Sequence, residues 1–473
     1  MKKVIKVMWG ILLPMMLHSQ YQWAKIYEGG GNEGEGICIQ QTIDGGYIVG
    51  TGYYDVLVMK LNSLGEVVWA KTYGAPSTYE AARWIQQTSD GGYILGGWCY
   101  GTSGNPPTPE YSNMFILKLN STGGITWAKI YGQDAQEIIH FIHQTSDGGY
   151  IVVGKTDGGP GYYDIVVMKL DSNGNIVWAK LYGGSQPEHD PCILQTSDGG
   201  YILTCETWTF GAWTSNFLVI KLDANGNVTW AKALGISAYD DVPRCIKQIS
   251  DGGYIIAGRS KIYVTPYMQW DPIVMKIGPN GEAIWAKRYE MQQFVQAHDG
   301  ANFISQTSDG GYVVAGSTEM GIYDSRSFLL KITSDGNLTW GKIYNGIGSN
   351  GASCVYVPTS GYIIAGSVYD SIEQRNDIYI VKTNSEGIVL SPQGDTCEGF
   401  EYSIPVISES FYTNTSVQVT VTSYSPIVST ALNLTATSVT PAIYTECEPV
   451  GIEEVCNCQK EYLSEIEISP NIG

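Results

Sequence analysis

The fold is decided by the unit at residues 141–182, FIHQTSDGGYIVVGKTDGGPGYYDIVVMKLDSNGNIVWAKLY. Short apolar runs alternate in it with turns rich in Asp, Asn and Gly. The Asp147-Gly148-Gly149 turn supplies the positive φ angles of a tight hairpin, and residues 171–175 form a second hairpin turn. Four hairpin-connected strands in about 50 residues are typical of one β-propeller blade. We predict these strands at residues 141–145, 150–154, 164–170 and 176–182.

The unit recurs along the chain. The tetrapeptide Asp-Gly-Gly-Tyr occurs six times and a shortened Ser-Gly-Tyr once, with consecutive tyrosines 46 to 58 residues apart. An open β-solenoid is the alternative architecture, but its coils are shorter and parallel. The sequence therefore predicts an all-β, seven-bladed β-propeller. The repeat tyrosines are Tyr47, Tyr93, Tyr150, Tyr201, Tyr254, Tyr312 and Tyr362.

A second signature predicts how the ring closes. Trp-Ala-Lys, which becomes Trp-Gly-Lys at Trp340, marks the fourth strand of the first six units, but one further copy, at Trp23, precedes the first unit. The seventh unit has no such copy, and Pro392 interrupts pairing there. We expect the strand at Trp23 to complete the seventh blade, because closing the ring removes exposed sheet edges.

The Thr-Ser-Asp-Gly-Gly-Tyr and Trp-Ala-Lys-x-Tyr-Gly signatures resemble those of secreted bacterial and archaeal β-propeller repeat proteins, from Trp23 to about Leu390. Residues 169–178, KLDSNGNIVW, are also similar to the tryptophan-docking repeat of quinoprotein dehydrogenases, with Gly174 and Trp178 at the docking spacing. This second resemblance implies a tryptophan that stacks between blades. A quinoprotein enzyme would also use a pair of adjacent cysteines, which this sequence lacks.

The ends of the chain differ from the repeats. The basic start at Lys2, Lys3 and Lys6, followed by an apolar stretch at 7–17, predicts a signal peptide over 1–19 and hence a secreted or cell-surface protein. The propeller is expected at 20–394. No later segment has the ~18 apolar residues of a membrane helix, so no membrane span is predicted.

Residues 395–450 are rich in Thr, Ser and Val, which predicts a small β module after the propeller. Residues 451–473 are expected to be a C-terminal tail or a truncated sorting segment. The stretch at 466–471, IEISPN, resembles the opening of a type IX secretion sorting domain.

The net charge of −19 and the isoelectric point of about 4.6 oppose binding to nucleic acid or to anionic lipid. The expected partners are an extracellular protein or a glycan, and the chain is expected to be a monomer. Fourteen of the 27 basic residues are lysines at two recurring strand positions. Their stems can cover apolar surface, with the ammonium groups near the aspartates of Asp-Gly-Gly-Tyr.

The cysteines form two groups. Cys38, Cys192, Cys245 and Cys354 share one repeat position that other units fill with Trp or Phe, so we predict buried, unpaired thiols. The other group can form disulfides in a secreted protein. A bridge between Cys397 and Cys447 is one possibility, and the disulfide connectivity of this group stays open. This group is Cys397, Cys447, Cys456 and Cys458.

Aromatic residues are frequent in the connections between the second and third strands. These connections vary between units and share one face of the ring, where propeller scaffolds place recognition. Exposed aromatics suit protein partners or sugar rings; the alternative is that they pack between blades. The candidates are Trp98, Tyr100, Tyr111, Tyr162, Tyr163, Trp208, Trp213, Tyr267 and Trp270.

A carboxylate recurs 13 residues before the repeat tyrosine. Placed at the channel mouth, such a ring can hold Ca²⁺, the one cofactor considered; alternatively each carboxylate accepts backbone N–H bonds that join blades. An open pocket shared with His189 or His298 would favour an enzyme. The candidates are Glu80, Glu137, Glu188, Asp241 and Asp299.

The sequence favours a recognition or scaffold module over an enzyme. It contains no Gly-x-Ser-x-Gly motif and no phosphate-binding loop, and we assign no catalytic residue and no metal site. The alternative is a carbohydrate-active or quinoprotein-like propeller enzyme whose site lies at the channel mouth.

Overall fold

The computed structural model describes residues 22–27, 38–52, 55–74, 79–100, 112–132, 135–159, 162–210, 214–235, 240–264, 267–290, 298–321, 324–344, 348–357, 361–370 and 375–390, together with short strands between 396 and 445. The predicted signal peptide and the tail at 451–473 lie outside these residues. Within the described ranges, no helix has the length and apolar character needed to cross a membrane.

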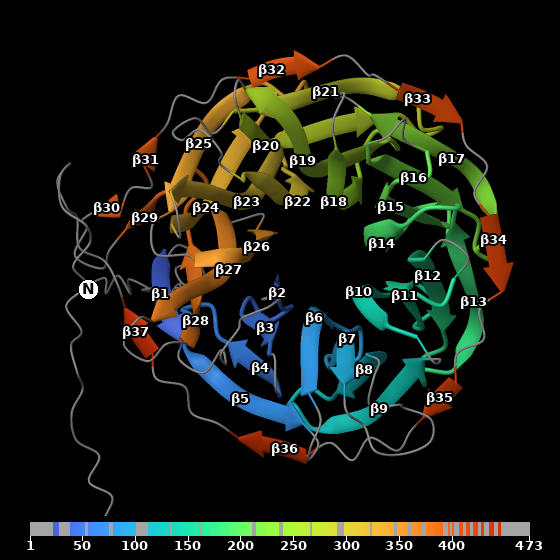
Figure 1. Cartoon of the computed structure of the whole chain (residues 1–473). Coiled ribbons are helices and arrows are strands. Elements are labelled where there is room, and N and C mark those ends of the chain that lie inside the picture. Colours follow the sequence, from blue (N-terminus) through green and yellow to red (C-terminus); the bar gives the residue numbers. More distant parts are fainter. Residues whose placement is uncertain are drawn as a thin grey trace, which may run out of the picture.

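Seven antiparallel sheets stand around a central axis and confirm the predicted seven-bladed β-propeller (Figure 1). In each blade the first strand is innermost and the fourth lies on the rim. Blades 1 to 3 comprise β2 (Cys38–Gln41), β3 (Tyr47–Thr51), β4 (Val56–Leu61), β5 (Val67–Gly74); β6 (Tyr79–Gln87), β7 (Tyr93–Tyr100), β8 (Asn113–Leu119), β9 (Ile125–Gly132); and β10 (Glu137–Gln144), β11 (Tyr150–Thr156), β12 (Asp164–Leu170), β13 (Ile176–Gly183).

Blades 4 to 6 repeat the same order. They comprise β14 (Glu188–Gln195), β15 (Tyr201–Thr207), β16 (Asn216–Leu222), β17 (Val228–Gly235); β18 (Asp241–Gln248), β19 (Tyr254–Val264), β20 (Tyr267–Ile277), β21 (Ala283–Tyr289); and β22 (Gly300–Gln306), β23 (Tyr312–Gly321), β24 (Asp324–Ile332), β25 (Leu338–Tyr344).

The seventh blade joins the two ends of the propeller, as the sequence predicts. Its first three strands are β26 (Gly348–Val357), β27 (Gly361–Asp370) and β28 (Arg375–Lys382), and its fourth is the N-terminal β1 (Trp23–Tyr27). β1 pairs antiparallel with β28 from Trp23↔Lys382 to Tyr27↔Ile378. The ring is therefore closed by backbone hydrogen bonds within one sheet.

The chain beyond the seventh blade runs around the outside of the ring (Figure 1). After a two-stranded ribbon of β29 (Val389–Leu390) and β30 (Thr396–Cys397), seven short strands each pair with the fourth strand of one blade, in reverse order from blade 6 to blade 1 and then blade 7. We call these strands the outer belt. They are β31 (Phe400–Glu401), β32 (Val406–Glu409), β33 (Thr413–Ser416), β34 (Thr420–Ser423), β35 (Ile427–Ser429), β36 (Thr435–Ser438) and β37 (Ile443–Thr445).

The belt differs from the separate small module that the composition of 395–450 predicts. Its strands do not pair with one another in a sheet of their own; each becomes the fifth strand of a blade. Strands of two to four residues are too short to enclose a core, but they can satisfy the open backbone groups of a sheet edge. Composition identifies such a segment as β without showing which edge it covers.

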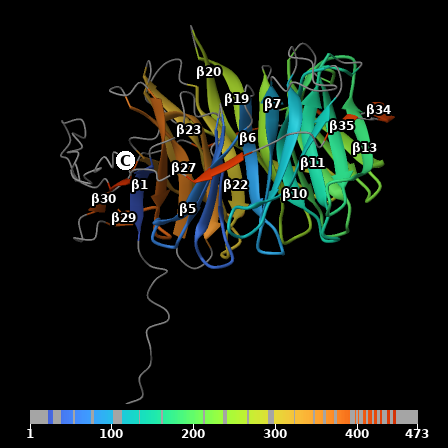
Figure 2. The same ribbon diagram turned by 90° about the horizontal axis from the view of Figure 1, so that it is seen from below.

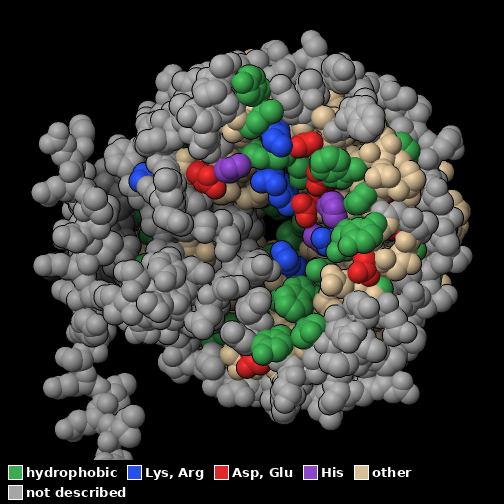
Figure 3. Space-filling model, in the orientation of Figure 1, with side chains coloured by type: hydrophobic (Ala, Val, Ile, Leu, Met, Phe, Trp, Pro, Cys, Tyr) green, Lys and Arg blue, Asp and Glu red, His purple; other side chains and the backbone are tan. Residues whose placement is uncertain are grey.

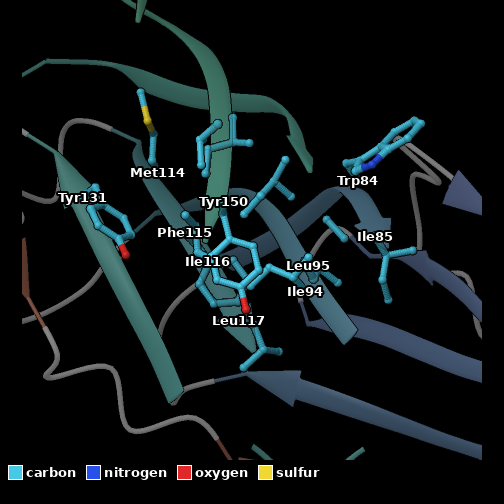
Figure 4. Packing of buried hydrophobic residues seen from close by; sticks show 14 of the residues in the cluster. Trp84, Ile85, Ile94, Leu95, Met114, Phe115, Ile116, Leu117, Tyr131 and Tyr150 are labelled. Atoms are coloured by element: carbon cyan, nitrogen blue, oxygen red, sulfur yellow. The ribbon is translucent and has the colours of Figure 1, made fainter. Parts of the chain in front are cut away.

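The hydrophobic core lies between neighbouring blades. Figure 4 shows one part of it, where Leu95 of β7 and Phe115 and Leu117 of β8 lie together with Tyr150 of β11 from the next blade. These four side chains are at most 1% exposed. The cysteines Cys38, Cys192 and Cys245 are buried and unpaired, as predicted; the side chain of Cys354 and those of the four C-terminal cysteines lie outside the described residues.

The Asp-Gly-Gly-Tyr turn is a structural unit. Gly148 has a φ of 81°, and a Cβ at the following glycine, Gly149, would lie 2.5 Å from the ammonium of Lys169. That ammonium pairs with Asp147 at 2.8 Å. The same lysine–aspartate pair forms in the first six blades, which confirms the expected place of the third-strand lysines.

Two further contacts join successive blades. Trp127 of blade 2 stacks on the turn glycine Gly174 of blade 3, whose Cβ would lie 2.9 Å from the ring, and the Tyr131 hydroxyl donates to the Gly174 carbonyl at 2.7 Å. On the inner strands, the Ser89 amide donates to Oε1 of Gln144 in the next blade at 2.7 Å. The tryptophan contact has the form that the docking-repeat resemblance implies.

Candidate functional site

The two faces of the ring have different characters. The lower face carries the recurring hairpin turns. The upper face carries the connections from second to third strands and between blades, and the β19–β20 hairpin projects beyond it (Figure 2). Around the central hollow of this face, charged, histidine and hydrophobic side chains gather (Figure 3). The variable chemistry of the molecule is thus concentrated at the upper channel mouth.

The predicted aromatic residues divide by exposure. Tyr162 is 71% exposed, and Trp208 and Tyr100 are exposed at 39% and 37%. Three others, Trp98, Tyr163 and Trp270, are half-buried. Tyr111, Trp213 and the side chain of Tyr267 lie outside the described residues.

The half-buried aromatics pack against cations. The guanidinium carbon of Arg259 lies 4.4 Å from the ring centroid of Trp270, and the ammonium of Lys155 lies 5.0 Å from that of Tyr163. Tyr163 also contacts the ring of His189 at 5.2 Å. These aromatic rings therefore position charged groups at the mouth, in addition to any contact that they make with a partner.

The five predicted carboxylates are buried. Their side chains are at most 2% exposed, so they are not presented to solvent at the channel mouth. The backbone amide of this residue donates to a carbonyl of the preceding blade in four blades, at 2.8 to 3.0 Å. The position therefore joins neighbouring blades through its backbone. These four bonds start at Glu137, Glu188, Asp241 and Asp299.

The carboxylate groups bond to hydroxyls of their own blades. Glu188 accepts from the hydroxyls of Thr207 at 2.9 Å and Thr209 at 2.8 Å, and Asp241 accepts from Ser260 at 2.6 Å. Burial, helped by the neighbouring Asp164 carboxylate and opposed by these hydrogen bonds, raises the pKa of Glu188 to about 7.

Asp299 has the same environment in blade 6. Burial, together with the Asp271 and Glu319 carboxylates, raises its pKa to about 8, although the bond from the Glu319 amide opposes the shift. The His189 ring contacts the Tyr163 ring at a tilt of 51°, and the His298 backbone amide donates to Glu319 at 3.3 Å. Among the described residues, no group of three or more His, Cys, Asp or Glu is arranged to hold a metal ion.

A β-bulge in the innermost strands creates a site that sequence reasoning missed. In β6, β10, β18 and β22 the pairing skips one residue, and in β14 it skips two. Bulges leave a residue outside the ladder and redirect its side chain, often next to functional sites. The skipped positions vary in chemistry between blades, although two of them are arginines: Arg83, His140, Asp190 with Pro191, Arg244 and Asn302.

These bulge residues interact across blades. The Arg244 guanidinium donates to Asp190 at 2.8 Å, and Asp190 has a positive φ of 50°. Burial opposes the charge of Asp190, but Arg244, His140 and Lys155 outweigh it and hold its pKa at about 2. Burial lowers the pKa of His140 to about 3, so its imidazole is neutral at physiological pH.

A second variable tier lies above the bulges, five residues after each repeat tyrosine. The backbone of these residues pairs with the first strand just above the bulge in blades 2 to 6. Burial raises the pKa of Glu206, and Asp190 adds to this effect, whereas Arg244 and Arg259 oppose it. The tier and the bulges thus form one electrostatic cluster. The residues of the tier in blades 2 to 6 are Trp98, Lys155, Glu206, Arg259 and Ser317.

The signal for this cluster was present in the sequence. Fourteen lysines occupy positions that recur in the repeat. The cations of the cluster are basic residues that do not recur: Arg83, Lys155, Arg244 and Arg259. An alignment of the repeats on their tyrosines, scored for positions that change chemistry between blades, would have found them. Recurrence along the sequence points instead to the carboxylates that precede the repeat tyrosines.

The fold and this site define the class of the molecule: a closed, seven-bladed β-propeller with a chemically varied upper channel mouth. No protein-family model and no curated protein sequence matches the chain.

Two solved structures show a distant similarity. A protein of unknown function from Bacteroides caccae is 10% identical, with 68% of this chain and 94% of that chain covered and a TM-score of 0.39. A eukaryotic initiation factor is 8% identical, with 84% and 98% covered and a TM-score of 0.37. These similarities carry no functional argument.

Proposed function

We propose that this protein is a secreted or cell-surface recognition module that binds an extracellular protein or glycan through the upper face of its propeller. One observation carries the proposal. The blades share nearly the same lower turns and inter-blade contacts, yet they differ in the bulge residues and in the tier above them. A scaffold whose turns and inter-blade contacts are constant, but whose side chains vary at one cluster, is suited to recognition.

Exposed aromatics on the same face support binding. Tyr162 and Trp208 present large apolar surfaces with few rotatable bonds, so contact with a sugar ring or a protein surface orders them at low entropic cost. The enzyme alternative required the carboxylates to share an open pocket with His189 or His298. The buried positions of Glu188 and Asp299 give that alternative no support.

The test is a comparison of binding by variants of opposite faces, with glycan arrays and extracellular protein fractions as probes. Tyr162→Ala and Trp208→Ala should each weaken binding about tenfold or more, since such contacts contribute over 1 kcal/mol. The control is Ile43→Ser on the lower face. Ile43 is 94% exposed and occupies the turn position that other blades fill with serine. Equal loss from both faces would contradict the proposal.

A further inference from the structure

We propose that the upper channel mouth binds the negatively charged group of an acidic glycan, with Arg259 and Lys155 as its cationic ligands. This inference rests on the proposed function, because it names the ligand class of the same face. Four features of the cluster support it: cations held in place without neutralisation, buried nitrogen atoms without partners, a local charge opposite to that of the whole chain, and aromatic rings beside the cations.

The first feature concerns how the cations are held. Arg259 packs on Trp270 at 4.4 Å and Lys155 on Tyr163 at 5.0 Å. Within the part of the chain that the structure describes, neither makes an ion pair. An aromatic face orients a cation but cancels none of its net charge, so both groups keep their capacity to pair with an anion.

The second feature is hydrogen bonding left unmade. Nε of Arg259 and Nε2 of His140 are buried and find no hydrogen-bond partner among the described residues. Both side chains act electrostatically on the same Asp190–Arg244 pair, which places them in one cluster. The buried Nε–H of Arg259 is costly without an acceptor, and a ligand oxygen would satisfy it; the buried Nε2 of His140 can likewise pair with a polar ligand atom.

The third feature is charge. Asp190 and Arg244 neutralise each other at 2.8 Å. The pKa of Glu206 is raised, by burial first, so this carboxyl of the cluster carries its charge less readily. A cationic cluster in a chain of net charge −19 is a local exception, and it is suited to drawing an anionic group into a hollow whose surroundings repel it.

The aromatic neighbours favour a sugar over other anions. Tyr163, which supports Lys155, contacts the largely exposed Tyr162 with ring centroids 5.0 Å apart. A pyranose ring can stack on such a surface while its substituent reaches the ammonium group. Uronate carboxylates and sulfate esters present the same chemistry to a guanidinium, and the experiment separates them.

The experiment uses the full chain and isothermal titration with four probes: an oligogalacturonide, its fully methyl-esterified form, a sulfated heparin oligosaccharide and poly-glutamate. We expect the free acid or the sulfated sugar to bind at least tenfold more tightly than the ester, with affinity falling as salt rises. The free acid identifies a carboxylate ligand and the sulfated sugar a sulfate. Tighter binding of poly-glutamate than of either acidic sugar would overturn the glycan assignment.

Two variants locate the site. Arg259→Gln and Lys155→Gln should each lower the affinity for the acidic sugar about tenfold and leave binding to the ester unchanged. The control is Lys180→Gln, which removes the same charge from the rim, where Lys180 donates to the Asn225 carbonyl at 2.8 Å. If Arg259→Gln does not fold, the comparison of acid and ester in the wild-type chain decides alone.

The outcomes separate the two proposals. Equal affinity for acid and ester, or no effect of either variant, overturns the anionic site while recognition by the upper face stands. Absence of binding to every glycan, combined with capture of a protein partner sensitive to Tyr162→Ala, also overturns this inference and keeps the proposed function.

Discussion

The turn glycine Gly226 of blade 4 lies directly beneath the indole of Trp178 from blade 3: a Cβ added to this glycine would lie 2.8 Å from the ring. The Tyr182 hydroxyl of the same strand donates to the Gly226 carbonyl at 2.6 Å. The fourth strand of each blade thus packs on a hairpin turn of the next blade.

This contact predicts unequal effects of two glycine substitutions. Gly226→Ala meets both a positive φ of 73° and the Trp178 ring, so we expect a loss of about 2–4 kcal/mol. Gly148→Ala is the control, because it has a φ of 81° but nothing within 4 Å of its Cβ, and should cost about 1 kcal/mol. Urea unfolding measures both, and equal losses would show that packing on the indole contributes nothing.

The closing strand gives a second prediction. A chain without residues 22–27 loses the fourth strand of blade 7 and the bond from the Tyr27 hydroxyl to the Gly65 carbonyl. We expect it to aggregate or to melt more than 10 °C lower, since an open sheet edge and an open ring result. Tyr27→Phe removes only that hydrogen bond and should cost about 1 kcal/mol. A truncated chain that melts like the intact one would refute closure by β1.

Stability should depend on pH through the buried carboxyls. The folded-state pKa of Glu188, about 7, exceeds the unfolded value of about 4.3. Its contribution to stability is therefore fully present below about pH 4 and is lost as the pH rises through 7. Glu188→Gln should be similar to the wild type at pH 4.5 and more stable by about 1–3 kcal/mol at pH 8.5.

The control for this titration is Glu66→Gln, which changes an exposed carboxylate on a lower turn. Thermal unfolding measured from pH 4 to 9 gives the comparison. A Glu188→Gln profile that matches the wild type would mean that the pKa of this carboxyl is the same in the folded and unfolded states.

The outer belt predicts a solubility phenotype. A chain ending at residue 394 keeps all seven blades and β1 but loses β30 and the belt strands β31–β37. We expect it to fold and then to self-associate, because seven fourth strands offer unpaired backbone groups. Light scattering over a concentration series measures this. A truncated chain that stays monomeric would show that the fourth strands are protected without the belt.

The ring was predictable because its determinants are local and repeated. Asp147-Gly148-Gly149 specifies a hairpin by itself. The copy of Trp-Ala-Lys at Trp23 predicts ring closure, because it has no unit of its own and the seventh unit lacks a fourth strand. The lysine–aspartate pairs were predictable because the lysine and the aspartate each recur at a fixed position in the repeat.

The belt and the bulge cluster were not predictable by the same reasoning. Which edge a four-residue strand covers depends on the path of the chain around the ring, and no residue in 395–450 encodes it locally. Whether Arg83 or His140 leaves the ladder depends on a one-residue shift of register. The carboxylate of Glu188 was found by its recurrence, but only the packing of the loops shows that it is buried.

The belt also sets the order in which mechanical force dismantles the molecule. Each of its strands is held on one side by two to four residue pairs, so a pull on the C-terminal end peels them off one at a time, beginning with β37. β1 is held on both sides, by β28 and by β37, so a pull on the N-terminal end must break two ladders together. The same fold would therefore yield gradually when pulled from its C-terminal end and resist when pulled from its N-terminal end.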